Sequence, residues 1–191
     1  MGLRSLIEPF FWHKYSKKVQ LRIESPYCVG SFTQEDAEER EFHFATGQEG
    51  SVQQGSCIAL FWLVDKTDGI IVDARFRAFG NSSLVAIGEA TCELCVGKNY
   101  DQVSRITAEF IEKHLREKND LAALPEEAYG DLNLAVDALE KTAATCSGIP
   151  LADTYVAPPI AHHEIEAVAG GYPGWKALTL KQKLAKAATR K

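Results

Sequence analysis

The fold of this chain is decided by the stretch Ile70-Ile71-Val72-Asp73-Ala74-Arg75-Phe76-Arg77-Ala78-Phe79. Apolar residues at its even positions alternate with charged residues at positions 73, 75 and 77, which is the two-residue period of a strand with one buried face. A turn sequence at 65–69 precedes it, and before that turn lie an apolar run at 57–64 and a shorter alternating segment from residue 42. The pattern predicts a three-stranded antiparallel sheet with one face buried.

Helical periodicity is found on both sides of this expected sheet. Apolar residues spaced three and four apart predict helices at about 12–24, 81–96, 103–115 and 132–146. The acid-rich segment 33–41 is interpreted as a solvated loop. Because the strands are grouped and the later helices are grouped, we predict an α+β fold, in which the three-stranded antiparallel sheet packs against about four helices in two layers.

Length and composition set the broad class. The chain has 191 residues, a net charge of −5 and 46% hydrophobic residues, which is typical of a globular protein. We expect a domain at 12–146 between an N-terminal extension at 1–11 and a linker with a basic tail at 147–191. No apolar run reaches the roughly 20 residues of a membrane span, and no export signal is evident, so we expect a cytoplasmic protein without a membrane partner. The acidic total argues against nucleic acid as a partner.

The cysteines are the first candidates for chemistry. In a chain without an export signal we expect most of them to be reduced, and each is either a small buried hydrophobe or a metal ligand or reactive thiolate. Cys92 and Cys95 lie on one side of a predicted helix, where core packing, a second metal or redox site, and a dimer contact are all open. We expect Cys28 in an exposed turn and Cys146 in the core. The five cysteines are Cys28, Cys57, Cys92, Cys95 and Cys146.

The order of these elements, together with several short strings, resembles one family. The chain is similar to the NifU/IscU iron–sulfur cluster scaffold proteins, that is, to the NifU N-terminal domain family, over roughly residues 12–146. The strings that carry the resemblance are Tyr15-Ser16-Lys17-Lys18-Val19, Val29-Gly30-Ser31-Phe32, Gly69-Ile70-Ile71-Val72-Asp73-Ala74-Arg75-Phe76, Gly97-Lys98 with Asp101, and Leu124-Pro125.

The resemblance implies a scaffold and not an enzyme. Such a protein accepts sulfur from a cysteine desulfurase, gathers iron, and holds a labile [2Fe–2S] cluster. The cluster then passes to an acceptor apoprotein, and a chaperone is a further possible partner. Clusters of this kind are bound by soft thiolates, usually as part of a set of four ligands. Family members commonly supply three cysteines and a nearby His or Asp.

Most of these ligand positions are substituted in this chain. The resemblance implies that Cys57 is the first ligand cysteine, while Ala59 stands at the accessory Asp position. Asn81 occupies the position of the second cysteine, and Gly130 and Asp131 occupy the positions of a His-Cys pair. Cys57 and Asp131 are therefore the candidate iron or cluster ligands. An Asn amide is a poor iron ligand, and both Asn81 and Asp131 could serve to cap helices.

Three functions remain open from the sequence. The chain could accept sulfur at Cys57 and share a cluster across a homodimer, with Cys57 and Asp131 from each copy. It could be a degenerate scaffold homologue that binds the assembly machinery, above all a cysteine desulfurase, without holding a cluster. A thiol-redox role for Cys92 and Cys95 is the third, although the C-terminal end of a helix disfavours thiolates.

Overall fold

The structure is a computed structural model that describes residues 12–118 and 121–151. The expectations for the extension at 1–11 and for most of the linker and tail, from residue 152 onward, lie outside the described residues. Within those residues, no helix combines the length and the apolar character needed to cross a membrane.

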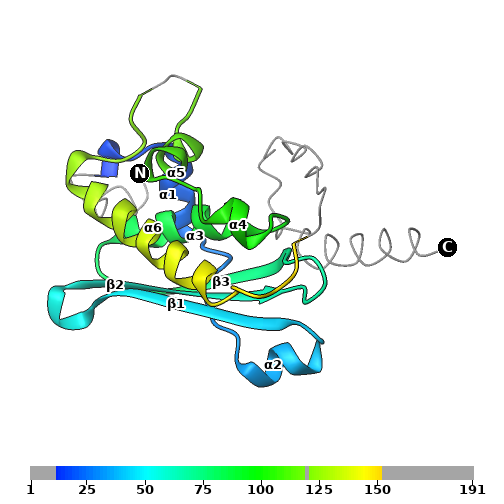
Figure 1. Cartoon of the computed structure of the whole chain (residues 1–191). Coiled ribbons are helices and arrows are strands. Elements are labelled where there is room, and N and C mark those ends of the chain that lie inside the picture. The colour runs from blue at the N-terminus through cyan, green and yellow to red at the C-terminus, as the bar shows by residue number, and fades with distance from the viewer. Residues whose placement is uncertain (1–11, 119–120, 152–191) are drawn as a thin grey trace. The chain divides into compact units, whose positions relative to one another are not determined.

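A three-stranded antiparallel sheet forms the base of the domain, as predicted. Its strands are β1 (His43–Ser51), β2 (Ser56–Val64) and β3 (Ile71–Phe79), in the order β1-β2-β3 (Figure 1). A short 3-10 turn at Val52–Gln54 joins β1 to β2. The ladder places Cys57 opposite Gly50 on β1 and opposite Phe79 on β3.

Helices cover one face of this sheet and form the second layer. α3 (Ser82–Cys95) packs on β3, and α6 (Tyr129–Ala144) crosses β1 and β2 on the same side (Figure 1). The approach of α6 is so close that a Cβ atom at Gly47 would lie 2.6 Å from the backbone nitrogen of Thr142. Alternate residues of β2, among them Trp62, are fully buried beneath this layer. The α+β prediction is confirmed.

The remaining helices pack around α3 and α6. They are α1 (Lys17–Glu24), α4 (Tyr100–Val103) and α5 (Ala108–Leu115), with 3-10 turns at Trp12–Lys14 and Glu126–Ala128. The helix expected at 12–24 therefore begins five residues later, and the helix expected at 103–115 begins at Ala108, while Val103 ends the separate short helix α4. Side-chain caps explain both starts, because Ser16 accepts from the Val19 N–H and Thr107 accepts from the Phe110 N–H.

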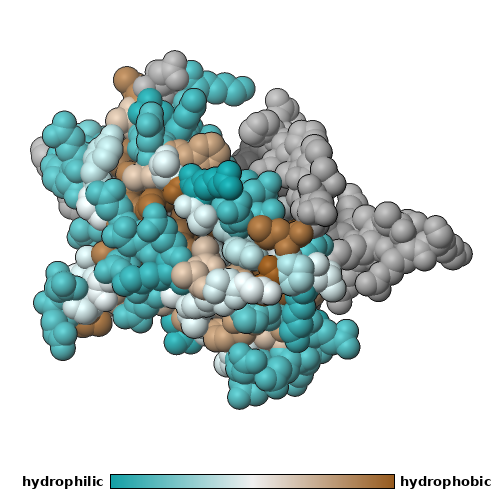
Figure 2. All heavy atoms as spheres, viewed as in Figure 1, coloured by the Kyte–Doolittle hydropathy of each residue, from teal (hydrophilic) through white to brown (hydrophobic). Residues whose placement is uncertain are grey.

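The loop predicted at 33–41 is wrong, because most of it forms the helix α2 (Gln34–Glu39). Thr33 and Asp36 form a capping box at its start, and acidic side chains in the first turn favour the helix dipole. The helix lies on the sheet face away from α3 and α6, with Ala37 buried against Leu63 (Figure 1). Figure 2 shows its outer side as hydrophilic surface, so the acids are solvated on a helix and not on a loop.

A mostly buried carboxylate joins three of the helices. Glu93 of α3 accepts a hydrogen bond from Nη2 of Arg22 on α1 at 2.7 Å, and its Oε2 lies 3.0 Å from Nε2 of His114 on α5. Burial opposes ionisation of Glu93, but the hydrogen bond with His114 and the charge of Arg22 outweigh it, so the Glu93 pKa lies below its ordinary value of 4.5. Glu89, on the same helix, is a nearby like charge.

We expect this network to make the fold sensitive to acid. A carboxyl group with a lowered pKa in the folded state stabilises the fold above its unfolded pKa, and this contribution is lost as pH falls through the lower folded pKa. The free energy of unfolding, measured with urea, should therefore fall more steeply between about pH 7 and about pH 3 in the wild type than in Glu93→Gln. An equal fall in both proteins would show that Glu93 has no part in the acid response.

Candidate functional site

Three segments that carry the candidate ligands meet at one end of the sheet. Cys57 is the second residue of β2 and faces Phe79 across the ladder, so Asn81 follows only two residues beyond that pair. Gly80 makes this approach possible, because its φ is +139° and a Cβ atom there would lie 2.9 Å from Cβ of Ser56. The start of α3 therefore passes directly beside the start of β2.

A buried hydrogen bond ties the start of α6 to the start of α3. Ser83 donates its hydroxyl proton to Oδ2 of Asp131 at 2.6 Å, and both side chains are buried. The first turns of the two helices are thereby held together near the start of β2. The structure thus brings together the segments that carry Cys57, Asn81 and Asp131.

The capping roles expected for Asn81 and Asp131 are wrong. Asn81 is the N-cap residue of α3, but its exposed side chain makes no capping hydrogen bond. Asp131 lies inside the first turn of α6, whose N-cap is Ala128, and it accepts from Ser83. The role of Asp131 follows from a tertiary contact, because the Ser83 hydroxyl that engages this carboxylate lies 48 residues away in the chain.

The five cysteines differ sharply in exposure, and all of them lie among the described residues. Cys57 is half-buried, whereas the other four are buried. Core packing is confirmed for Cys92, Cys95 and Cys146. The exposed turn predicted for Cys28 is wrong, because its backbone N–H donates to the Glu89 carboxylate at 2.8 Å and this bond draws the residue against α3.

Burial also suppresses the reactivity of the buried thiols. Burial raises the pKa of Cys92, and the nearby Cys28 thiol raises it further. Burial also raises the pKa of Cys95. It raises the pKa of Cys146 to about 11. These side chains remain protonated, and thiols are poor nucleophiles and metal ligands in that form. The burial therefore weighs against the second metal or redox site considered for Cys92 and Cys95.

The donor set at the end of the sheet is small for a cluster. Cys57 offers a thiol and Asp131 a carboxylate that Ser83 already engages, whereas Asn81 offers an amide and Gly130 no side chain. Over residues 12–118 and 121–151 there is no group of three or more His, Cys, Asp or Glu side chains placed to hold a metal ion. A four-ligand cluster site is not complete within the described part of one chain.

Sequence reasoning missed Ser83 and the apolar surroundings of Cys57. Phe79, opposite Cys57, is 51% exposed, and Val52 in the adjoining hairpin turn is 63% exposed. The alternation of β3 puts Phe79 on the same face as the charged residues, and this signal could have indicated its exposure. No local signal could reveal the Ser83–Asp131 bond, because the two residues lie on different helices.

The fold and this site define a class: small α+β proteins with a half-exposed thiol where a sheet ends and two helices begin. The family model of the NifU-like N-terminal domain matches residues 14–151, which is most of the chain. The chain belongs to this family, and the resemblance seen in the sequence is confirmed.

Curated relatives agree with this assignment. The chain is 35% identical over 102 residues to iron–sulfur cluster assembly protein 2 of Arabidopsis thaliana, an alignment covering 53% of this chain and 59% of that protein. It is 31% identical over 138 residues to the nitrogen fixation protein NifU of Trichormus azollae, covering 72% of this chain and 43% of that protein. The chain thus spans less than two thirds of the length of either relative.

The structural comparison concerns the fold alone. A crystal structure of a protein described as an iron–sulfur cluster assembly scaffold for the SUF system, from Fervidobacterium islandicum, matches with a TM-score of 0.51 and 17% sequence identity. The match covers 69% of this chain and 97% of that one.

Proposed function

We propose that this chain serves iron–sulfur cluster assembly by accepting sulfur from a cysteine desulfurase on Cys57. The observation that carries the proposal is the selective accessibility of this thiol, since the four other cysteines are buried. Family membership supports the context, because the relatives are named for iron–sulfur cluster assembly and nitrogen fixation. The role is stoichiometric acceptance and not catalysis.

The proposed transfer needs one thiolate and one persulfide. Cys57 loses its proton to solvent, and its thiolate attacks the outer sulfur of a persulfide on the desulfurase cysteine. A new sulfur–sulfur bond forms at Cys57 while the donor's sulfur–sulfur bond breaks, and its electron pair leaves with the donor cysteine as a thiolate. Cys57 then carries the persulfide, and no further oxidant or reductant is consumed.

The surface around Cys57 fits a protein donor. Phe79, the ladder partner of Cys57, exposes an apolar side chain, as does Val52 in the turn that leads into β2, and exposed apolar groups of this kind are commonly covered in protein complexes. A docked desulfurase would bury them and exclude water from the persulfide. The apolar neighbours therefore support a macromolecular sulfur donor.

Cluster holding needs ligands from outside the described part of one chain. Two copies that each contribute Cys57 and Asp131 would supply four ligands, and the [2Fe–2S] cargo would then pass to an acceptor apoprotein. The bond from Ser83 opposes this arrangement, because Asp131 would have to leave a buried partner. The incomplete donor set favours a second candidate function, a scaffold homologue that binds the desulfurase without holding a cluster.

Sulfur transfer to Cys57 is tested by mass spectrometry. The chain is incubated without oxygen with cysteine and the desulfurase encoded in the same genome, then alkylated and digested. We expect one additional sulfur atom on the Cys57 peptide of the wild type and none after Cys57→Ala. The matched control is Cys146→Ala, which removes a buried thiol and should leave the transfer unchanged.

Each outcome separates the candidates. Equal sulfur uptake by the wild type and Cys57→Ala would overturn the proposal. Desulfurase binding without sulfur uptake by the wild type would favour the second candidate function. Iron and sulfide per chain after anaerobic reconstitution, read with the native mass, would show whether a cluster is shared between two copies.

A further inference from the structure

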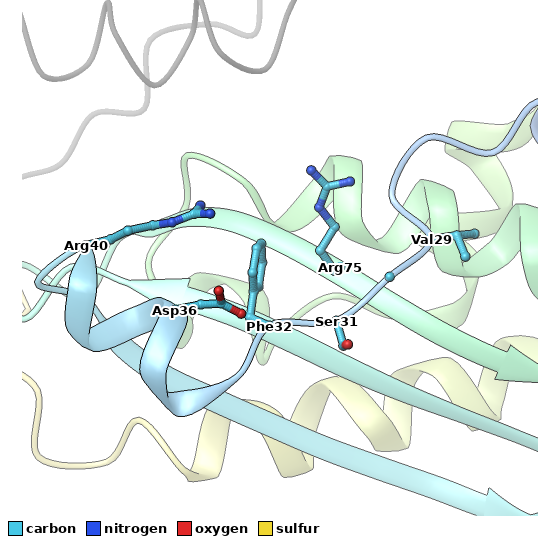
Figure 3. A pocket seen from close by; sticks show the side chains of 7 residues that line it. Val29, Ser31, Phe32, Asp36, Arg40 and Arg75 are labelled. Atoms are coloured by element: carbon cyan, nitrogen blue, oxygen red, sulfur yellow. The ribbon is translucent and has the colours of Figure 1, made fainter.

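A polar pocket lies away from the Cys57 end of the sheet, between α2 and β3. It has a volume of about 310 Å³, and its lining combines the segment before α2 with residues from the two ends of that helix and from the middle of β3. Figure 3 shows two guanidinium groups on one side of this pocket with an aromatic ring between them. The lining residues are Val29, Gly30, Ser31, Phe32, Asp36, Arg40 and Arg75.

The two guanidinium groups differ in how they are held. Arg75 donates from Nη1 to the carbonyl oxygen of Tyr27 at 2.9 Å, and its Nε lies 3.7 Å from Oδ1 of Asp73. The guanidinium of Arg40 makes no hydrogen bond or ion pair with any other described residue, and the side chain is exposed; its charge acts on Asp73 from a longer distance. One cation is therefore fixed in place, and the other has all its donors available.

The Phe32 ring sets the spacing of the two cations. The guanidinium carbon of Arg40 lies 5.7 Å from the ring centroid, and that of Arg75 lies 5.9 Å from it. Contacts of this kind are attractive and orient planar guanidinium groups. Like charges are thereby held near one another, which favours an anion that both can reach.

The carboxylates near the pocket do not neutralise it fully. Asp36 lines the pocket, but its Oδ2 accepts from the backbone N–H and the hydroxyl of Thr33 in the capping box of α2. Asp73 is mostly buried, and its Oδ1 has no hydrogen-bond partner among the described residues. A third cation, Arg77, donates to the Ser31 hydroxyl at 2.7 Å beside the pocket. The lining itself thus carries two guanidinium groups and one carboxylate, and that carboxylate is engaged in the capping box.

We propose that this pocket binds a small molecule through a carboxylate or phosphate group held between Arg40 and Arg75. Guanidinium groups bind such oxyanions through paired, charge-assisted hydrogen bonds. The volume fits a small ligand, whereas a stable protein interface would cover a much larger surface. The site lies apart from the Cys57 thiol, so its occupancy does not depend on the proposed sulfur transfer.

The test is calorimetric titration of the full chain at low ionic strength with inorganic phosphate and, separately, with citrate. We expect saturable binding of one or both, with one site per chain. Arg40→Gln should weaken the binding about tenfold, because one charge-assisted contact is lost. Phosphate binding alone identifies a phosphate ligand, and citrate binding alone identifies a carboxylate ligand.

The matched control is Arg105→Gln, which removes the same charge from an exposed ion pair with Asp101 on α4. It should leave the affinity unchanged. Equal weakening by the two substitutions would indicate nonspecific charge attraction and overturn the proposal, as would the absence of saturable binding at millimolar concentrations. Because the Arg40 guanidinium is exposed and loses only its contact with the Phe32 ring, Arg40→Gln should melt within a few degrees of the wild type.

Discussion

An Asn81→Cys/Gly130→His/Asp131→Cys variant is expected to hold a [2Fe–2S] cluster by itself. With Cys57, these substitutions place three thiols and one imidazole on the segments that meet at the end of the sheet, which completes a four-ligand set. Space is available, because the Asn81 side chain is exposed and a Cβ atom at Gly130 would meet nothing within 4 Å. Cluster formation is measured after anaerobic reconstitution by visible absorbance and by the iron and sulfide content of each chain, in the triple variant and in the wild type.

The gain should come at a cost in stability. Asp131→Cys leaves the buried Ser83 hydroxyl without its partner, which should lower the free energy of unfolding by roughly 1–3 kcal/mol. The control is the same triple variant with Cys57→Ala, which should lose the cluster. Iron and sulfide equal to the wild type in the triple variant would show that these positions do not converge on Cys57.

Gly88→Ala is expected to destabilise the fold strongly. Gly88 lies in the middle of α3, where Ala normally adds about 1 kcal/mol of helix stability. Here the new Cβ would lie 2.4 Å from Cδ2 of Phe76, whose ring is buried on β3. Moving α3 off the sheet, or the ring out of place, should cost more than the propensity gain, with a net loss of roughly 1–3 kcal/mol in urea unfolding.

Gly130→Ala is the matched control for that overpacking. It makes the same chemical change in the first turn of α6, where the added methyl group meets nothing within 4 Å. We expect a gain of up to about 1 kcal/mol in the free energy of unfolding. If Gly88→Ala and Gly130→Ala changed the free energy of unfolding in the same direction, the result would contradict the close packing of α3 on Phe76.

Some wrong predictions could have been avoided because the sequence carries a local signal, whereas others concern contacts that leave no local signal. The helix at 34–39 could have been predicted, because Thr33 and Asp36 have the spacing of a capping box. The burial of Cys28 could not, because it depends on Glu89, which is 61 residues away. The start of α1 at Lys17 depends in part on Ser16, whose hydroxyl also donates to the Leu115 carbonyl oxygen.

The sequence alone determined the three strands, the family and the positions at which cluster ligands are expected, because alternation and short strings are local properties of the chain. Only the tertiary structure decided which thiol is accessible, that Asp131 is engaged by Ser83, and that Arg40 and Arg75 share a pocket. The physical reason is that exposure, buried hydrogen bonds and spacing between charges arise from residues far apart in the chain, and packing brings these residues together.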